Sequence, residues 1–243
     1  MSGTAWLVLP TFNEAGNIEA VVAAAVKQLE ACAPEGFRIL IVDDSSPDGT
    51  GELADRLAAS YDSVEVLHRG AREGLGPAYL AGFRHALDAG AARVFQMDAD
   101  FSHDPADLGR LLAAIDAGAD LALGSRYVPG GGVEHWGLLR RVVSRGGSAY
   151  ARRVLGLHVR DLTGGFKCFR REVLEAIGLD TIHSHGYSFQ IELTQRALQR
   201  GYTVREVPII FRDRRAGRSK MSPWIAMEAI VVLPQLRWRR HWR

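Results

Sequence analysis

The chain has 243 residues, of which 47% are hydrophobic, and its formal net charge at pH 7 is +2. This length and composition predict one α/β domain, and no nucleic-acid partner is expected. Cys32 and Cys168 are too few for a disulfide framework, so a reducing, cytoplasmic compartment is expected. We expect no signal peptide, and no apolar stretch approaches the roughly 20 residues that span a bilayer.

Apolar runs typical of strands alternate with helical patterns through the first two thirds of the chain, which predicts βαβ units and a mainly parallel sheet. The expected strands are residues 6–9, 37–42, 64–67, 93–97 and 121–123. The expected helices are residues 18–29, 51–60, 78–89 and 106–117. The last third has too few apolar strands for a core of its own, so we expect it to extend the same domain. Its expected elements are helices 138–155 and 187–200 and strands 203–207 and 209–211.

The C-terminal segment differs from the rest in composition. After an apolar stretch from Trp224 to Leu236, residues 237–243 carry four arginines, a histidine and two tryptophans. Such a mixture suits the headgroup layer of an anionic membrane. We therefore expect one domain over residues 1–220 and an amphipathic, membrane-interfacial segment over 221–243, with a helix that begins near Pro223. An ordinary helix docked on the core is the alternative.

Two carboxylates, Asp98 and Asp100, directly follow the expected strand 93–97. In an open α/β sheet, ligands bind in the crevice outside the carboxyl ends of the strands. Two acids there repel each other unless a cation lies between them, and Mg²⁺ or Mn²⁺ fits oxygen ligands and substrate phosphates. The alternative is a polar turn in which Asp100 caps the next helix. A calcium loop is a poorer interpretation, because its sixth and twelfth positions hold His103 and Gly109.

Acids also follow the first two expected strands. Glu14 comes after the first, and Asp43 and Asp44 come after the second. Three sets of acids at one edge of a sheet predict a binding site there. Asp44 could accept hydrogen bonds from a base or a ribose, while an Asx-rich turn over residues 43–48 is the alternative.

Other known signatures are broken or absent in the sequence. The glycine pattern at residues 74–76 lacks its third glycine, because Tyr79 stands in that place. There is no P-loop, no serine nucleophile elbow and no Cys/His metal spacing. Four basic residues beside glycines or turns suit phosphate binding, although each alone can be a solvated surface charge: Arg126, Arg140, Arg214 and Lys220.

Four strings of residues carry a resemblance to a known family. They are Leu-Pro-Thr-Phe-Asn-Glu at 9–14, Val-Asp-Asp-Ser-Ser-Pro-Asp-Gly-Thr at 42–50, Met-Asp-Ala-Asp-Phe-Ser-His at 97–103 and Gly-Ser-Arg-Tyr at 124–127. With the late Gly-Arg-Ser-Lys at 217–220, they resemble the polyprenol-phosphate (dolichol-phosphate) mannose synthases, which are family 2 glycosyltransferases with the GT-A fold. The resemblance continues through Trp136, Arg140, 144–146 and 163–166, so it covers nearly the whole chain.

The resemblance implies a fold and an activity. The fold would be the α/β GT-A nucleotide-sugar-binding fold, with a mainly parallel central sheet flanked by helices and a C-terminal amphipathic helix. The activity would be inverting transfer of mannose from GDP-mannose to a polyprenyl monophosphate, with Mg²⁺ or Mn²⁺ as cofactor. The protein would lie on the cytoplasmic face of a membrane, with an integral-membrane protein as a possible partner. Glucose transfer from UDP-glucose and a non-catalytic nucleotide-sugar-binding subunit are the alternatives.

The resemblance also assigns roles to residues. Guanosine would be held by Pro10, Phe12, Glu14, Val42 and Asp44. Asp98 and Ala99 would contact the ribose and the diphosphate, and Asp100, with Asp98, would bind the metal. Phosphates would be contacted by Arg126, Arg214 and Lys220, and the catalytic residues would be Asp100, Arg214 and Lys220. Ser102 and Arg140 are further candidate substrate-binding residues. In two departures from the family, Phe12 stands where Tyr is usual and Ser102 stands where some members place Gln.

The implied reaction requires little acid–base catalysis from the protein. A phosphate monoester has a second pKa of about 6, so the acceptor is already a dianion at neutral pH. It needs no general base, and residues 186–190 hold no acidic pair of the kind that related enzymes use with hydroxyl acceptors. Catalysis would then rest on alignment and electrostatics.

Overall fold

The computed structural model describes residues 3–213 and Pro234. Arg214, Lys220 and the expected helix from near Pro223 lie outside the described residues, as does the rest of segment 221–243 apart from Pro234.

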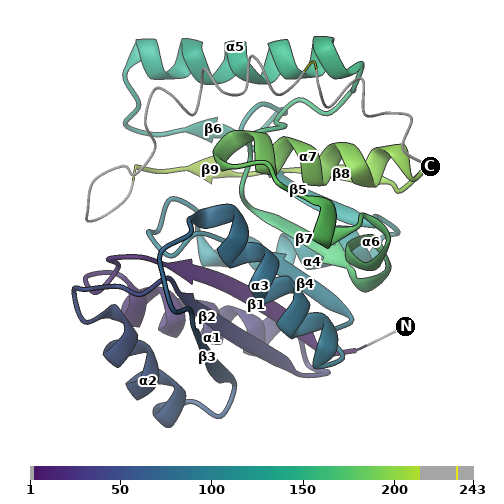
Figure 1. The fold of residues 1–243 in the computed structure, drawn as a ribbon. Helices are drawn as coiled ribbons and strands as arrows, with labels where there is room; N and C mark the ends of the chain where they lie inside the picture. The colour runs from purple at the N-terminus through teal and green to yellow at the C-terminus, as the bar shows by residue number, and fades with distance from the viewer. Residues whose placement is uncertain (1–2, 214–233, 235–243) are drawn as a thin grey trace.

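A seven-stranded sheet forms the centre of the molecule, in the order β3-β2-β1-β4-β7-β5-β8 (Figure 1). Its strands are β1 (Ala5–Thr11), β2 (Phe37–Asp43), β3 (Val64–His68), β4 (Arg93–Gln96), β5 (Leu121–Ser125), β7 (Lys167–Arg170) and β8 (Val204–Pro208). Strand β7 runs antiparallel to β4 and to β5, and the other pairs are parallel. The predicted mainly parallel sheet is confirmed, and the last third of the chain completes the same sheet.

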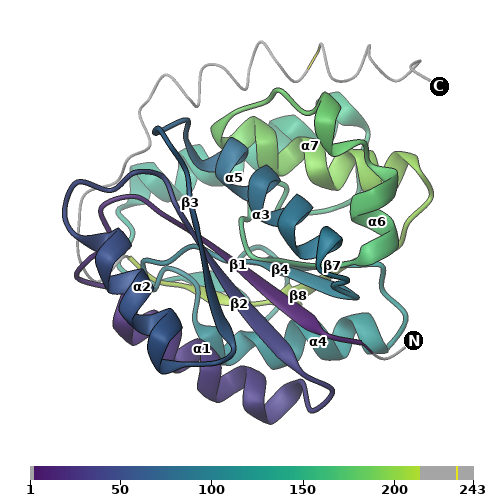
Figure 2. The same cartoon turned by 60° about the horizontal axis from the view of Figure 1, so that its bottom comes forward.

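Helices cover both faces of the sheet (Figure 2). On one face lie α1 (Ile18–Cys32), α2 (Thr50–Ser60) and α4 (Leu108–Asp116). On the other lie α3 (Leu75–Asp88), α6 (Arg171–Ala176) and α7 (Gly186–Gln199). The short 3-10 turns are Pro105–Asp107 and Leu179–Thr181. Among the described residues, no helix combines the length and the hydropathy needed to cross a bilayer.

The central strands are buried on both faces, which explains their almost continuous apolar sequences. In β1, Leu7 and Leu9 face the α1 side, whereas Val8 faces the α3 side. Gly82 of α3 lies so close to β1 that a β-carbon there would overlap the Val8 side chain. Val42, in β2, also packs on the α3 side and is fully buried. Its side chain therefore belongs to the core rather than to a cavity wall.

Helix α5 (Leu138–Leu155) lies apart from these layers, beyond a small parallel sheet of β6 (Gly132–Val133) and β9 (Ile210–Phe211) (Figure 1). The predicted helix at 138–155 is confirmed. Its Ala151 and Leu155 pack against Leu123 of β5 and Ile191 of α7. This contact fixes α5 at one end of the sheet.

Candidate active site

A cavity of about 370 Å³ opens at the carboxyl ends of β1, β2 and β4, where the sequence predicted a site. Its wall also includes residues from the starts of α3, α5 and α7. The predicted site residues that line it are Pro10, Phe12, Glu14, Asp44, Asp98, Ala99, Asp100, Ser102, Arg126 and Arg140. Among the predicted residues that the structure describes, Val42 alone is absent from the wall, because its side chain packs under α3.

Asp98 and Asp100 both reach the cavity from the loop after β4. Asp98 Oδ1 accepts a hydrogen bond from the Tyr79 hydroxyl at 2.9 Å, and Asp100 Oδ1 accepts one from the Ser102 backbone N–H at 2.9 Å. Burial, and then the charge of Asp98, raise the pKa of Tyr79 well above its ordinary value, so its hydroxyl remains a neutral donor. The helical turn that follows is capped by Asp104 instead, since its side chain accepts from Ala106 N–H at 3.0 Å.

The two carboxylates suit a hard divalent cation that also binds substrate phosphates. They do not suit a metal held by protein side chains alone. Within residues 3–213, no group of three or more His, Cys, Asp or Glu side chains is placed to hold a metal. Mg²⁺ is usually bound through one or two carboxylates, with substrate phosphates and water completing its shell. Asp98 and Asp100 supply that number of acidic oxygen donors at the cavity wall.

His103 lies beside these acids without neutralising them. Burial lowers its pKa to about 4, so the imidazole is uncharged near pH 7. Its Nδ1 faces the backbone N–H of Asp98 at 3.4 Å and therefore serves as an acceptor, and it lies 4.0 Å from Asp98 Oδ2. The ring packs on Phe166 with 5.1 Å between centroids. His103 thus shapes this wall while leaving its negative charge in place.

Asp44 closes one end of the cavity by holding the loop at residues 69–74. Its Oδ1 accepts from Arg69 at 2.5 Å, and its Oδ2 accepts from the backbone N–H groups of Glu73 at 3.1 Å and Gly74 at 2.9 Å. The same loop places the Arg72 guanidinium 4.1 Å from the centre of the Phe12 ring. A planar base would find both an aromatic face and a cation at this end.

The neighbouring acids have a structural role, as the Asx-turn interpretation predicted. Asp43 Oδ1 accepts from the hydroxyls of Thr11 at 3.0 Å and Ser46 at 2.6 Å. Asp48 accepts from Thr50 at 2.5 Å and from the loop after β1. These bonds tie the loops after β1 and β2 together. Asp44 is the acid of this stretch that lines the cavity.

Three residues at these strand ends adopt left-handed backbone conformations. They are Asn13 (φ 55°), Ser45 (φ 58°) and Phe101 (φ 62°), which follow β1, β2 and β4. Such conformations cost non-glycine residues on the order of 1 kcal/mol each. Strain of this kind clusters at ligand sites, and here it occurs in each of the three loops that carry the acids.

Two arginines also line the cavity. Arg126 is 6% exposed, and its Nε and Nη2 donate to the two oxygens of Asp161 at 2.7 and 2.6 Å. Burial opposes its charge, but attraction to Asp161 outweighs burial and raises the pKa of Arg126 above its ordinary value. Arg140 lies 4.1 Å from the centre of the Trp136 ring and donates to Asp213 at 2.5 Å. The same cavity is therefore lined by the acids of the β4 loop and by two arginines, each paired with an aspartate.

Residues 6–178 match the family model described as Glycosyl transferase family 2. The chain belongs to glycosyltransferase family 2.

Two curated relatives within glycosyltransferase family 2 are similar to this chain over most of its length. The polyprenol monophosphomannose synthase of Mycolicibacterium smegmatis is 51% identical over 230 residues, which cover 94% of this chain and 85% of the relative. The undecaprenyl-phosphate mannosyltransferase of Micrococcus luteus is 46% identical over 224 residues, which cover 92% of this chain and 90% of the relative. The predicted family resemblance and the prediction of an enzyme are confirmed.

Solved structures agree with the predicted fold class. Glucosyl-3-phosphoglycerate synthase from Mycobacterium tuberculosis, in complex with Mn²⁺, UDP and glucosyl-3-phosphoglycerate, superposes with a TM-score of 0.70 at 21% identity. The match covers 97% of this chain and 80% of that one. Another crystal structure of that synthase gives a TM-score of 0.68 at 20% identity, covering 97% of this chain and 81% of the other. At this level of identity the likeness confirms the GT-A fold.

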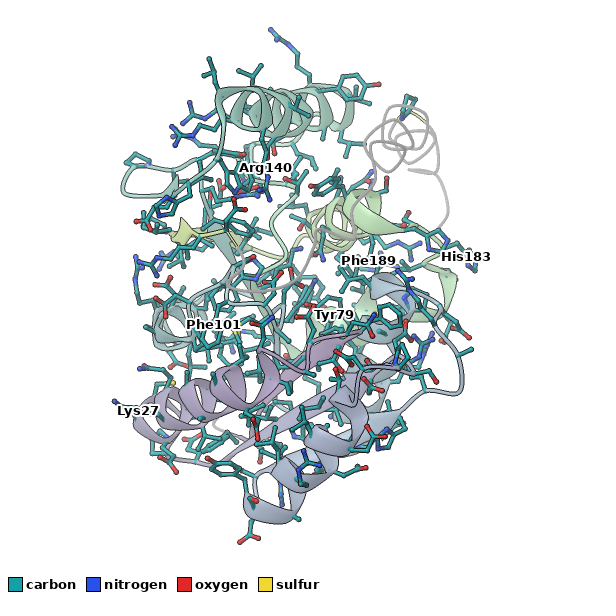
Figure 3. The ribbon with its side chains drawn as sticks, turned by 90° about the vertical axis from the view of Figure 1, so that its left-hand side faces the viewer. Lys27, Tyr79, Phe101, Arg140, His183 and Phe189 are labelled. Atoms are coloured by element: carbon teal, nitrogen blue, oxygen red, sulfur yellow. The ribbon has the colours of Figure 1, made fainter. Side chains whose placement is uncertain are left out.

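Several residues in or behind the cavity wall of this glycosyltransferase were not predicted from the sequence. Tyr79, which donates to Asp98 from behind the wall, was considered only as a break in a glycine pattern. His103 was considered only as a mismatch to a calcium loop and as the last residue of the string at 97–103, with no role in the site. Gln190 lies on α7, whose start is held by the stacked rings of Phe189 and Tyr79, 6.2 Å apart (Figure 3). No spacing in the sequence links α7 to the loop after β4, so these residues become neighbours only through the sheet order.

Proposed function

We propose that this glycosyltransferase transfers mannose from GDP-mannose to a polyprenyl monophosphate, with inversion at the anomeric carbon. The observation that carries the proposal is one cavity lined both by the acids Asp98 and Asp100 and by the arginines Arg126 and Arg140. Such a cavity suits two phosphorylated substrates held together. The names of the two curated relatives, a polyprenol monophosphomannose synthase and an undecaprenyl-phosphate mannosyltransferase, support the sugar and the lipid acceptor.

The donor would lie along the carboxyl edge of β1, β2 and β4. Pro10, Phe12, Glu14 and Asp44 would hold the guanosine, with Val42 contributing its backbone, and Asp98 and Ala99 would contact the ribose and the diphosphate. Glu14 Oε2 accepts from the Asn17 side chain at 2.8 Å, which orients its carboxylate at the edge of the cavity. The Asp44 carboxylate, which holds the loop at 69–74, would keep Arg72 over the base.

The reaction would be one in-line displacement. An oxygen of the acceptor phosphate forms a bond to the anomeric carbon, the bond from that carbon to the GDP oxygen breaks, and the electron pair leaves with the diphosphate. No general base is required, because the acceptor arrives as a dianion. Mg²⁺ or Mn²⁺ held by Asp100 and Asp98 would neutralise charge on the departing diphosphate. Arg126 and Arg140, together with Arg214 and Lys220 as the family resemblance implies, would align the phosphates.

The lipid acceptor also requires contact with a membrane surface. Helix α5 supports this part of the proposal, because Leu138, Val142 and Val143 are 79%, 59% and 55% exposed and have exposed arginines such as Arg141 and Arg145 as neighbours. Apolar side chains among arginines suit an anionic bilayer surface. We propose that α5 and the segment 221–243 rest on the cytoplasmic face, where an integral-membrane protein could bind.

Calorimetric titration tests the nucleotide. With Mn²⁺ present, GDP should bind at least about tenfold more tightly than UDP, a difference of about 1.4 kcal/mol. Glu14→Ala should weaken GDP binding, whereas Glu19→Ala, an exposed acid of α1, should leave it unchanged. Equal or tighter binding of UDP would contradict the GDP-mannose donor and favour transfer of glucose from UDP-glucose.

A further inference from the structure

A buried hydrogen-bond network behind the cavity involves residues to which no role has been given. Lys167 of β7 is fully buried, and its Nζ donates to the Gly164 carbonyl at 2.6 Å and to Gln190 Oε1. The same Gln190 oxygen accepts from Gln96 Nε2 at 2.8 Å. Gln190 lies on α7, is itself 4% exposed, and lines the cavity. Two donors from two strands therefore converge on one amide oxygen.

This convergence fixes which end of the amide faces the ligand. A lysine ammonium has donors and no acceptor, so the group that faces it has to be the Gln190 oxygen. Burial lowers the pKa of Lys167 to about 7, and even the uncharged amine keeps two N–H donors for the two oxygens beside it. The orientation is thus the same in both protonation states. The Gln190 Nε2 group is consequently turned away from Lys167.

The amide nitrogen faces the cavity near Asp98. A β-carbon on Gly165, which lines the cavity, would lie 3.5 Å from Gln190 Nε2 and 3.8 Å from Asp98 Oδ2. Within residues 3–213, no hydrogen bond from this nitrogen to a protein acceptor is formed. The cavity wall therefore presents a held N–H donor beside Asp98.

We propose that Gln190 is a specificity-determining residue, whose Nε2 donates to a phosphate oxygen of the acceptor, and that Lys167 is the positioning residue that holds the amide in this orientation. The inference rests on the proposed function, since it names the contact by which that cavity selects an ionised acceptor. An amide N–H cannot remove a proton from a hydroxyl group. It can hydrogen-bond an oxygen that is already negative, and bonds to charged groups are stronger than neutral ones.

The substitution Gln190→Glu separates this role from a structural one. A glutamate keeps the size of the side chain and would pair with Lys167, so the folded state should lose little stability. Its second oxygen would replace the N–H donor with an acceptor and repel a phosphate. The matched control is Gln199→Glu, which adds the same charge at an exposed position of the same helix.

The full-length protein, loaded with GDP and Mg²⁺, is titrated calorimetrically with a short, soluble polyprenyl monophosphate. Gln190→Glu should weaken acceptor binding by about tenfold or more, while GDP binding and the melting temperature stay near those of the wild type and the control. Lys167→Met should weaken acceptor binding less, and Lys167→Arg, which again offers only donors, should restore it.

Acceptor binding by Gln190→Glu within twofold of the wild type would overturn the inference. An equal loss of GDP binding would overturn the acceptor assignment, because the amide would then contact the diphosphate of the donor. A melting temperature that falls in step with acceptor affinity in Gln190→Glu would show a structural role instead. Because binding is measured rather than transfer, a wrong sugar in the proposed function would leave these outcomes readable, and the GDP titration of the wild type tests that function separately.

Discussion

Asp100 is the residue on which the proposed chemistry depends most. It is 4% exposed, its Oδ1 accepts from the Ser102 N–H, and it lines the cavity rather than the apolar core. Asp100→Asn should therefore fold normally and lose about a thousandfold in kcat, since metal-assisted departure of a leaving group contributes several kcal/mol. Steady-state kinetics with circular dichroism would measure both effects. Asp88→Asn, at an exposed position of α3, is the control. Turnover near that of the wild type, or activity unchanged by EDTA, would contradict the role.

The burial of Lys167 predicts how the free energy of unfolding depends on pH. Burial lowers its pKa from 10.5 to about 7, so between these values the unfolded chain binds a proton that the folded chain does not. The free energy of unfolding should rise with pH across this window, by up to about 1.4 kcal/mol per unit from this group. Lys167→Met removes the contribution. The stability difference between the variant and the wild type, from urea unfolding at pH 7 to 9, should therefore change steadily in favour of the wild type. A constant difference would mean that the buried amine keeps its proton.

At the scale of elements, the packing of α3 on β1 depends on the absence of a β-carbon at Gly82. A β-carbon at Gly82 would overlap Val8, whereas a β-carbon at Gly147 of α5 meets nothing within 4 Å. Gly82→Ala should lower the free energy of unfolding by about 1–3 kcal/mol through overpacking. Gly147→Ala should raise it by roughly 0.5–1 kcal/mol, because alanine loses less backbone entropy in a helix. Urea unfolding of both variants measures the contrast. Similar effects in the two would contradict the close approach of α3.

Some helices and strands of the fold can be predicted from local sequence patterns, and others cannot. Helix 138–155 and the strands that carry the acids were predicted from periodicity and apolar runs, and βα alternation then placed Glu14, Asp44 and Asp98 at one edge. Strand β7 is absent from the strands expected from the sequence. Only Cys168 and Phe169 of its four residues are apolar, and the buried Lys167 interrupts the apolar run by which a buried strand is predicted. Its antiparallel insertion between β4 and β5 depends on pairing partners far away in the sequence.

The same reason limits prediction of the site. Strand-end acids carry a signal in the sequence, because a sheet gathers the ends of its parallel strands. Gln190 and Tyr79 carry none, since each reaches the site from a helix whose position is set by packing. Val42 shows the reverse case: the family resemblance names it, while its side chain points into the core under α3.

At the scale of the whole molecule, membrane contact and nucleotide binding should be separable. The described cavity is built from residues before 214, and the segment 221–243 has no expected role in holding GDP. Removing residues 221–243 should leave GDP binding with Mn²⁺ near that of the full chain and sharply reduce sedimentation with anionic vesicles. Added salt should weaken the remaining vesicle binding.

The truncated protein also distinguishes the alternatives for its membrane contact. If truncation unfolds the protein, the segment is part of the core structure and the interfacial interpretation is wrong. If the truncated form sediments as the full chain does, α5 carries the contact, and Val142→Glu in that form should then abolish it.

The most direct test of the account is a transfer assay with two labelled donors. The full-length protein, Mg²⁺ or Mn²⁺ and a polyprenyl monophosphate are incubated with radiolabelled GDP-mannose or with radiolabelled UDP-glucose, and the label extracted into organic solvent is counted. We expect label from GDP-mannose, none above background from UDP-glucose, and none from either donor without the lipid phosphate. Label from UDP-glucose alone would contradict the donor, and no label from either donor, with GDP binding intact, would contradict the proposed transfer itself.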